Sequence, residues 1–353
     1  MSFSRRIEAL MRGEAEGLTG TLLGALSVLY AAGVRSRLLS YKLGVLPSHS
    51  LPIKVVSVGN LTVGGTGKTP VAIFLARFFK NDGKRVALLS RGYKGGARGV
   101  AVVSDGGKIL MEPGEAGDEP FLMARSLEGV PVVVCADRVK GGRFIIERFS
   151  PDVLILDDAF QHIRLRRDIN ILLVDSNEGF GNGRLLPRGI LREPLSSIRR
   201  ADFALIKGGQ PQGRVWDALN EYSIPYIPFR YRPCGIFNID SGEELPVEAL
   251  RGARVISVCG IANPASFRQS LKELGAVVEA ELDFPDHHAY SASDGRNIEH
   301  RAAGREMVIT TEKDGVKLCG LVKSPPVFAL RISIEVEERL MHSALAPLLR
   351  GVL

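Results

Sequence analysis

The chain has 353 residues, enough for two domains, and 45% hydrophobic with 24% charged residues is an ordinary globular composition. Its net charge of +7 indicates an anionic partner, and charge alone leaves nucleotide, nucleic acid and an anionic membrane surface open. The cysteines exclude a zinc-ribbon or disulfide-scaffold class, because their spacing suits neither, and they are expected to be buried apolar residues in a reducing compartment. They are Cys135, Cys234, Cys259 and Cys319.

Residues 17–34 carry no charge and have basic residues on both sides. Three interpretations compete: a signal peptide, a core helix, or a helix that inserts in or lies on a membrane. A signal peptide is disfavoured, because acidic residues precede the stretch and a nucleotide-binding domain follows it. The basic flanks, the glycines and Tyr30 favour an interfacial or shallowly inserted helix over a core helix.

Residues 51–70 have the pattern of a phosphate-binding loop. An apolar strand ends at Val58, a glycine-rich turn follows, and apolar residues at helical spacing come after Pro70. Thr62 stands where the usual consensus has glycine, so an ordinary strand-to-helix turn is the alternative, but the Lys-Thr pair disfavours it. Turns of this kind cradle phosphates with backbone N–H groups, while the lysine reaches the β and γ phosphates and the threonine hydroxyl binds Mg²⁺. The predicted nucleotide-binding residues are Gly64, Gly65, Thr66, Gly67, Lys68 and Thr69.

Two further segments place polar residues at the ends of predicted elements. The strand from Lys84 runs into a basic, glycine-rich loop containing Tyr93, which is either a ligand-binding loop at the carboxyl edge of the sheet or a solvated turn. Asp118 and Glu119 precede a helical pattern over 121–127. Acidic residues at a helix start are often only caps, so their role stays open at this point.

Two predicted strands have the form of a Walker B segment. After a strand over 130–136 and a helix over 142–149, residues 151–158 form an apolar strand that ends in Asp157 and Asp158. The strand Ile169–Asp175 has the same form, and either segment could supply a carboxylate for Mg²⁺. The paired acid and the Ala-Phe-Gln-His that follows favour Asp157.

The remainder predicts an anion-binding loop and a second, smaller α/β unit. Gly- and Pro-punctuated residues 179–194 carry Arg184, Arg188 and Arg192, which suits anion binding. A strand over 201–207 and a helix over 215–222 precede a linker or extended ribbon over 224–238. Strands over 254–260, 277–282 and 307–311, with helices over 264–274 and 293–303, make the second unit. Its loop contains Asp286, His287 and His288, of which one histidine is expected to act, and a metal pair is not expected.

Other classes of P-loop protein fit these residues less well. The segment Thr311-Glu-Lys-Asp-Gly does not match the Asn-Lys-x-Asp segment of guanine-nucleotide switches, and Val63 stands where partitioning ATPases have lysine. A nucleic-acid interface would need basic residues interleaved with aromatics, which the chain lacks. A small-molecule or lipid kinase needs the loop, Mg²⁺ ligands, a proton acceptor and cations, all of which are present.

The chain resembles the tetraacyldisaccharide 4'-kinase family, and the resemblance runs essentially end to end. Thr62 is the usual kind of residue for the family at its position. The motifs that carry it are Val58-Gly-Asn-Leu-Thr-Val-Gly-Gly-Thr-Gly-Lys-Thr-Pro, Ser90-Arg-Gly-Tyr, Gly117-Asp-Glu-Pro, Asp157-Asp-Ala-Phe-Gln-His, Leu186-Pro-Arg-Gly-x-Leu-Arg-Glu-Pro and Asp286-His-His.

The resemblance implies an ATP- and Mg²⁺-dependent lipid kinase at the cytoplasmic face of the inner membrane. It would phosphorylate the 4'-hydroxyl of its substrate, tetraacyldisaccharide 1-phosphate, and its product would be lipid IVA. Nucleic acid is not expected as a partner. A P-loop ATPase or switch protein without a lipid substrate is the alternative. Oligomeric state and acyl-chain preference stay open. The expected division is an N-terminal membrane-associated segment (1–47), a P-loop core (48–228), a smaller α/β domain with a two-stranded linker (229–326), and a return strand with a terminal helix (327–353).

Residue by residue, the resemblance assigns Lys68 and Asp118 to catalysis, with His287 as helper from the smaller domain. Thr69 and Asp157 are expected to hold Mg²⁺, with Glu119 as a weaker assignment. The expected substrate contacts are Tyr93, Arg138, Asp158, Arg188 and Arg192.

Overall fold

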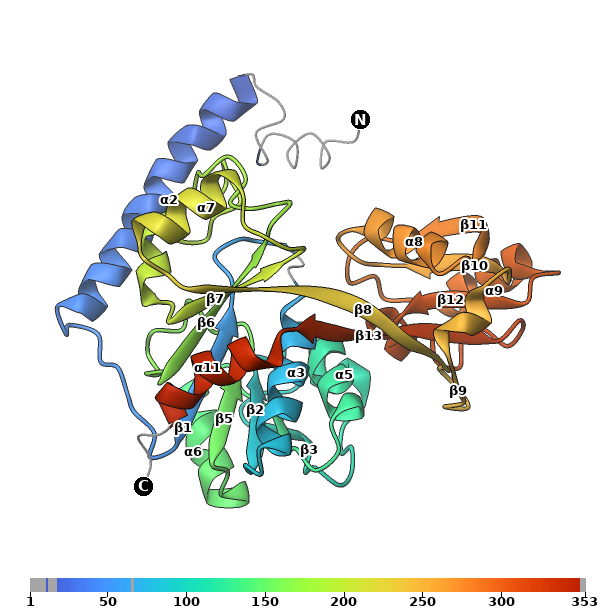
Figure 1. Cartoon of the computed structure of the whole chain (residues 1–353), viewed down its shortest axis with the longest axis horizontal. Helices are drawn as coiled ribbons and strands as arrows, with labels where there is room; N and C mark the ends of the chain where they lie inside the picture. The colour runs from blue at the N-terminus through green and yellow to red at the C-terminus, as the bar shows by residue number, and fades with distance from the viewer. Residues whose placement is uncertain (1–10, 12–17, 65–66, 350–353) are drawn as a thin grey trace.

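A single sheet runs through both halves of the molecule (Figure 1). The structure, a computed structural model, describes residues 11, 18–64 and 67–349. Within these ranges the strands are β1 (Lys54–Gly59), β2 (Val86–Ser90), β3 (Ala101–Ser104), β4 (Val132–Val134), β5 (Val153–Leu156), β6 (Ile169–Asp175), β7 (Phe203–Lys207), β8 (Tyr226–Asn238), β9 (Glu244–Leu245), β10 (Arg254–Cys259), β11 (Val277–Asp283), β12 (Met307–Thr311) and β13 (Val327–Val336). They lie in the order β11-β10-β12-β13-β8-β7-β6-β1-β5-β2-β4-β3, with β9 paired to β8.

The N-terminal half is built on parallel strands that are buried on both faces. Every residue of β2, β4 and β5 is buried, which explains why these segments are continuous apolar runs. Only the edge strand β3 is antiparallel to its neighbour here. Strand β1 lies between β5 and β6, so the loop after it leaves the carboxyl edge at the centre of the sheet, where open α/β sheets bind ligands.

Helices cover both faces of this half of the sheet. The helices of the described residues are α2 (Leu18–Lys42), α3 (Lys68–Asn81), α4 (Pro113–Ala116), α5 (Asp118–Ser126), α6 (Arg138–Phe149), α7 (Gly213–Glu221), α8 (Pro264–Glu273), α9 (Ala292–Ala302), α10 (Glu312–Leu318) and α11 (Glu338–Leu349), with 3-10 turns η1 (Leu195–Arg200) and η2 (Val247–Leu250). Helix α3 packs on the face that Val56 presents, together with α5 and α11. Helix α6 packs on the face that Val55 presents, since neighbouring strand residues point to opposite sides.

The C-terminal half is a smaller α/β unit joined by two long antiparallel strands. In it β10 lies between β11 and β12, all parallel, while α8 and α9 pack against different sides of these strands. Strands β8 and β13 pair from Phe229 with Val336 to Asn238 with Phe328, and β8 also pairs with β7 of the first half. The predicted fold class, a P-loop-like α/β core joined to a second α/β unit by a two-stranded linker, is confirmed.

Helix α2 lies along the outside of the N-terminal half (Figure 1). Its segment Gly20–Lys42 is long and apolar enough to cross a membrane by length and composition, and only 6% of its most apolar window is buried. Leu22, Val28 and Leu29 are 64%, 69% and 71% exposed. A core helix would bury such side chains, so the core-helix alternative does not fit this structure.

The sequence patterns misplace some helix starts and miss several elements. Helix α6 begins at Arg138 rather than near residue 142, because the Asp137 side chain caps it by accepting from the N–H groups of Val139 and Lys140. Helix α3 begins at Lys68, before Pro70, which the first turn of a helix tolerates. Strand β3 and helix α10 were not predicted. The domain limits expected from the sequence stay predictions, since one sheet runs through both halves.

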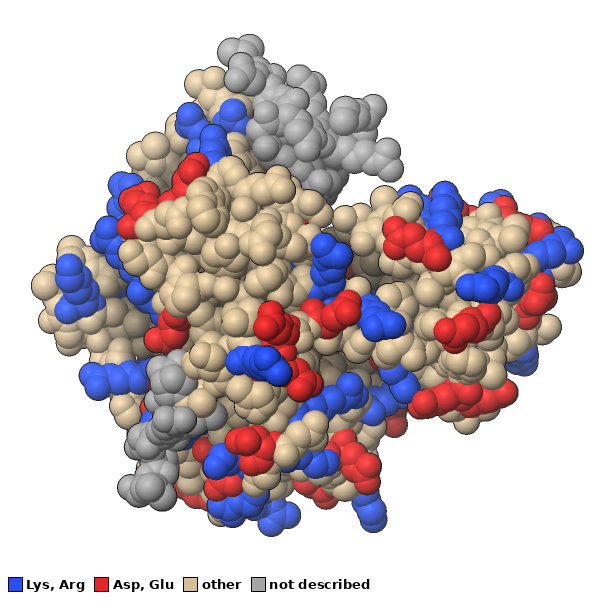
Figure 2. All heavy atoms as spheres, in the orientation of Figure 1, with Lys and Arg blue, Asp and Glu red and all other residues tan. Residues whose placement is uncertain are grey.

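Charged side chains of both signs are spread over both halves on the face shown in Figure 2. Of the charged residues in the described ranges, many are paired locally, as in Arg85 with Asp152 and Arg254 with Glu279. The net charge of +7 is therefore not gathered into one basic stripe on this face.

Candidate active site

The phosphate loop follows β1 and ends where α3 begins. Gly67 sits at the N-cap of α3 with a φ of 80°, a left-handed conformation that favours glycine. The amine of Lys68 lies 3.5 Å from Asn60 Oδ1 and 3.7 Å from Asp158 Oδ1, and Thr69 is 7% exposed. Two of the predicted loop residues, Gly65 and Thr66, lie outside the described residues.

Thr62 departs from the consensus because the first part of the loop is extended. Thr62 forms a β-bridge with Leu191, and Val63 N–H donates to the carbonyl of Ile190. A β-branched residue suits such a bridge better than glycine does. The phosphate loop is thereby hydrogen-bonded to the segment that carries the predicted anion-binding arginines.

Asp157 is a buried carboxylate at the end of β5 that is short of partners. Ser90 Oγ donates to its Oδ2 at 3.3 Å, while Oδ1 is buried with no hydrogen-bond partner among the described residues. Burial, together with the carboxylates of Glu119 and Asp158, raises the pKa of Asp157 to about 7, although Lys68 acts in the opposite direction.

These residues fit a magnesium ion bound together with phosphates. No group of three or more His, Cys, Asp or Glu in the described ranges has metal-site geometry. Mg²⁺ does not need one, because it usually takes one or two carboxylates and completes its shell with phosphate oxygens and water. The orphaned Oδ1 of Asp157 and the Thr69 hydroxyl at the start of α3 are such a set.

The alternative Walker B residue, Asp175, is engaged elsewhere. Its Oδ2 lies 2.8 Å from Lys207 Nζ, and its Oδ1 accepts from the N–H of Asn177 at 2.9 Å. Although burial alone would raise it, the bond to Lys207 holds the pKa of Asp175 below its usual range. Of the two strand-end carboxylates left open by the sequence, the geometry favours Asp157.

The second aspartate of the pair, Asp158, lies between two cations. It has a φ of 46°, and its carboxylate lies 3.2 Å from Arg192 Nη1 and 3.7 Å from Lys68 Nζ. Burial favours the neutral acid, but Lys68 and Arg192 outweigh it and lower the pKa of Asp158. Asp158 thus holds the phosphate-loop lysine and an arginine of the 179–194 loop together.

Asp118 and His287 meet across the two halves of the molecule. Asp118 is the first residue of α5, and its Oδ2 lies 3.6 Å from His287 Nδ1 in the loop after β11. The Tyr93 ring meets the His287 ring edge-on with centroids 6.0 Å apart. The predicted pair is therefore brought together, and Tyr93 lies beside it.

Helix α10 adds two lysines that sequence reasoning missed. Lys317 Nζ lies 3.5 Å from Asp118 Oδ2 and 3.0 Å from Asp314 Oδ1, and Lys313 Nζ lies 3.1 Å from His287 Nε2. The sequence contains a signal for this helix and its lysines. Thr311 can cap a helix, and lysines four residues apart share one helix face. Comparison of this segment with the base-reading motif of guanine-nucleotide switches does not bring these lysines out.

The predicted substrate-binding arginines differ in their surroundings. Arg138 is 3% exposed and donates to the carbonyls of Cys135 at 2.6 Å and Asp157 at 3.2 Å. Burial lowers the pKa of Arg138 to about 10, and this conformation leaves it no surface for the expected substrate contact. The carbonyl of Arg188 accepts from Asn182 Nδ2 at 2.9 Å. Glu193, to which the sequence reasoning gave no role, is fully buried beside Arg200.

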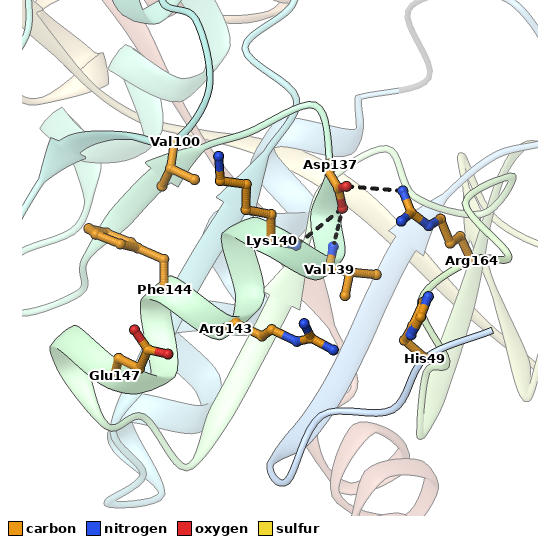
Figure 3. Close-up of a pocket in the computed structure, with 9 residues that line it drawn as sticks. All are labelled: His49, Val100, Asp137, Val139, Lys140, Arg143, Phe144, Glu147 and Arg164. Atoms are coloured by element: carbon orange, nitrogen blue, oxygen red, sulfur yellow. Dashed lines mark hydrogen bonds and ion pairs between the residues drawn. The ribbon is translucent and has the colours of Figure 1, made fainter. Parts of the chain in front are cut away.

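A separate pocket lies against α6, away from the phosphate loop. Its volume is about 520 Å³, and Figure 3 shows Arg164 directed at Asp137 beside the capped start of the helix. The ion pair between these two residues measures 3.0 Å. None of the predicted site residues lines this pocket, whose walls are His49, Val100, Asp137, Val139, Lys140, Arg143, Phe144, Glu147 and Arg164.

A phosphate loop, a buried strand-end carboxylate and an aspartate–histidine pair shared between two α/β units define a P-loop phosphotransferase. Residues 19–350 match the family described as tetraacyldisaccharide-1-P 4'-kinase. The chain belongs to this family, and it is a kinase of lipid A biosynthesis.

Relatives match over nearly the whole chain. Tetraacyldisaccharide 4'-kinase of Syntrophus aciditrophicus is 45% identical over 333 residues, which are 90% of this chain and 89% of the relative. The enzyme of the same name from Desulfatibacillum aliphaticivorans is 43% identical over 352 residues, 96% and 95% of the two chains. A crystal structure of LpxK from Aquifex aeolicus, described as the "apo" form in complex with ATP, is 37% identical with a TM-score of 0.78, and the match covers 94% of this chain and 100% of that one.

Proposed function

We propose that this protein transfers the γ-phosphate of ATP to the 4'-hydroxyl of tetraacyldisaccharide 1-phosphate and so forms lipid IVA. The observation that carries the proposal is the contact between Asp118 and His287, one from each half, at a helix start whose next residue acts on a carboxylate of the phosphate-loop site. Glu119 follows Asp118 directly and is close enough to raise the pKa of Asp157. An acceptor hydroxyl at Asp118 would therefore lie near phosphates held by Lys68.

The proposed nucleotide site uses the loop after β1. Gly64 and Gly67 present backbone N–H groups to the phosphates, and Lys68 neutralises charge on the β and γ phosphates. Gly65 and Thr66, which lie outside the described residues, are assigned to the same site from the sequence alone. Thr69 and Asp157 would hold Mg²⁺, and Glu119 is a further candidate ligand. The ion, when bound, would neutralise charge on the phosphates.

The proposed chemistry needs one proton acceptor. The Asp118 carboxylate accepts the proton of the 4'-hydroxyl as the O4'–P bond forms and the bond from the γ phosphorus to the bridging oxygen breaks, with ADP as leaving group. His287 holds the Asp118 carboxylate, and Lys313 lies on the far ring nitrogen of that histidine. Tyr93, Arg188 and Arg192 are the proposed contacts on the substrate side.

The proposed location is the cytoplasmic face of the inner membrane. The exposed apolar surface of α2, with Arg35 and Lys42 toward its C-terminal end, suits the boundary between acyl chains and anionic headgroups. The lipid substrate would then meet the enzyme at the membrane surface.

The test is incubation of the purified protein with γ-labelled ATP and the disaccharide acceptor. Label in the lipid is expected, and label found only as free phosphate would favour an ATPase or switch protein. Asp118→Asn and Lys68→Ala should each lower transfer about 100-fold or more while thermal unfolding stays close to wild type. Near wild-type turnover by Asp118→Asn would remove Asp118 from the role of base. Glu115→Gln, an exposed carboxylate on α4, is the matched control and should leave turnover unchanged.

A further inference from the structure

One side of helix α2 is bonded to the loop that carries the site arginines. Ser27 Oγ donates to the carbonyl of Leu185 at 2.8 Å, and Tyr30 Oη donates to the carbonyl of Arg192 at 3.0 Å. Arg37 lies two turns beyond Tyr30 on the same side of the helix and reaches Glu193. The outer side of α2 is apolar and exposed, so the helix has one polar side for the protein and one apolar side for its surroundings.

A first route leads from Arg37 to the phosphate-loop lysine through Arg192. Arg37 Nη2 lies 2.5 Å from Glu193 Oε1, and Glu193 is fully buried. The residue before it, Arg192, pairs with Asp158 at 3.2 Å, and Asp158 lies 3.7 Å from Lys68 Nζ. The backbone that Arg37 and Tyr30 hold is thus the backbone from which Arg192 reaches the site.

A second route leads from the same arginine to the same lysine. Arg37 Nη1 donates to the carbonyl of Gln161 at 3.4 Å, and Gln161 Nε2 donates to the carbonyl of Asn60 at 2.7 Å. The Asn60 side chain in turn accepts from Lys68 Nζ at 3.5 Å. Two independent chains of contacts therefore start at one residue of α2 and converge on Lys68.

We propose that Arg37 and Tyr30 of α2 are positioning residues for the ATP site, so that the helix presented to the membrane also sets the geometry of Lys68. A helix that served only as an anchor would need no polar contacts to the site loops. Loss of Arg37 leaves the buried Glu193 carboxylate with one ion-pair partner among the described residues, Arg200, and releases the backbone at Arg192. Asp158 then loses its fixed partner and draws Lys68 away from the phosphates.

The experiment compares Arg37→Met, Arg37→Lys and Tyr30→Phe in the full-length protein. The matched control is Arg35→Met, which removes the same charge from an exposed position on the same helix. Three quantities are measured: ATP affinity by calorimetry without lipid, kcat and KM for lipid in detergent micelles, and binding to vesicles with one-third phosphatidylglycerol. Thermal unfolding checks that each variant is folded.

Arg37→Met is expected to weaken ATP binding about fivefold and lower kcat about tenfold, while KM for lipid and vesicle binding stay within twofold of wild type. Arg37→Lys should recover most of the loss, Tyr30→Phe should lower kcat about threefold, and Arg35→Met should match wild type in ATP affinity. Equal ATP affinities for Arg37→Met and Arg35→Met would overturn the proposal, as would a loss confined to vesicle binding. If Arg37→Met does not fold, Tyr30→Phe and Arg37→Lys decide by the same readouts.

This inference rests on the proposed function only for the kcat readout. The calorimetric comparison needs no acceptor, so a wild-type protein that binds ATP but transfers nothing to lipid would refute the proposed function and leave the positioning role to be judged on ATP affinity.

Discussion

Lys317 is the cation of α10 that reaches the predicted base. Its Nζ is buried, lies 3.5 Å from Asp118 Oδ2 and has no hydrogen-bond partner among the described residues. We expect Lys317→Met to lower kcat for lipid phosphorylation about 10- to 100-fold, because the Asp118 carboxylate loses the charge that orients it across the two halves. Steady-state kinetics and calorimetry check the prediction, and ATP affinity should change less than twofold.

Two companion variants sharpen this test. Lys317→Arg keeps the charge and should retain most of the activity, whereas Lys323→Met removes an exposed lysine of the same half and should have no effect. Equal turnover for the Lys317 and Lys323 methionine variants would mean that the ammonium plays no part in the reaction.

His162 gives the folded protein a dependence on pH. Its Nε2 is buried without a partner among the described residues, and burial, then the charges of Arg138 and Arg167, lower the pKa of His162 to about 4. The unfolded chain, with an ordinary pKa near 6.5, takes up the proton first as the pH falls. The contribution of the neutral, buried His162 to the free energy of unfolding is therefore fully present above about pH 6.5. It is lost progressively as the pH falls towards 4.

The resulting loss should be about 1 kcal/mol between pH 7 and pH 5, after allowance for the part of the ring that water reaches. Asp157, whose pKa is raised, acts in the opposite direction over this range, so the loss is measured as a difference between proteins: urea unfolding of wild type and of His162→Gln at both pH values. The change in the free energy of unfolding from pH 7 to pH 5 should be more favourable in His162→Gln by this amount, while His300→Gln, on the exposed side of α9, should behave like wild type. An unchanged pH response in His162→Gln would place the titrating group elsewhere.

At the scale of elements, local signals predicted what local forces determine. The strand Ile169–Asp175 was predicted with both ends correct, because a buried parallel strand is a continuous apolar run. The phosphate loop followed from its glycines and Lys68. Contacts between distant segments have no local sequence signal. No residue spacing predicts that α10 packs on α5, or that Arg138 points inward rather than at a substrate. Those facts depend on how the two halves meet.

The junction of the phosphate loop with the linker strand β8 makes a further prediction. Tyr231 Oη donates to the carbonyl of Gly67 at 2.8 Å. A Cβ atom at Gly67 would lie 1.9 Å from Tyr231 Oη. We expect Gly67→Ala to weaken ATP binding at least tenfold, because both the φ of 80° and the contact oppose the methyl group. Calorimetry with ATP measures the change.

A glycine elsewhere in the chain is a control for the conformational strain. Gly99 has a φ of 75° but open space around it, so Gly99→Ala carries the conformational strain without the clash and lies outside the phosphate loop. It should bind ATP as wild type does and lose only a little stability. Wild-type affinity in Gly67→Ala would show that the linker strand can yield, and that Tyr231 does not fix the loop.

At the scale of the molecule, three bodies meet at one site. The N-terminal half holds the phosphate loop, the C-terminal half supplies His287 and the α10 lysines, and α2 holds the arginine loop from outside. The two halves are continuous through β8 and β13, so a change of their relative orientation must bend these strands. The Asp118 contacts to His287 and Lys317 cross between the two halves, so such a bend would open them.

The outer surface of α2 predicts a separation of membrane binding from folding. Leu22, Val28 and Leu29 are mostly exposed, so replacing all three by Gln should cost the fold little and shift the unfolding temperature by no more than about 2 °C. Transfer of such side chains into a bilayer contributes about 1 to 2 kcal/mol each, so the triple variant should bind vesicles at least about 100-fold more weakly. Flotation with vesicles and thermal unfolding measure the two effects. The same number of Gln substitutions at exposed Ile109, Leu110 and Val277 should leave vesicle binding unchanged, and equal losses in the two triple variants would mean that α2 is not the membrane-binding surface.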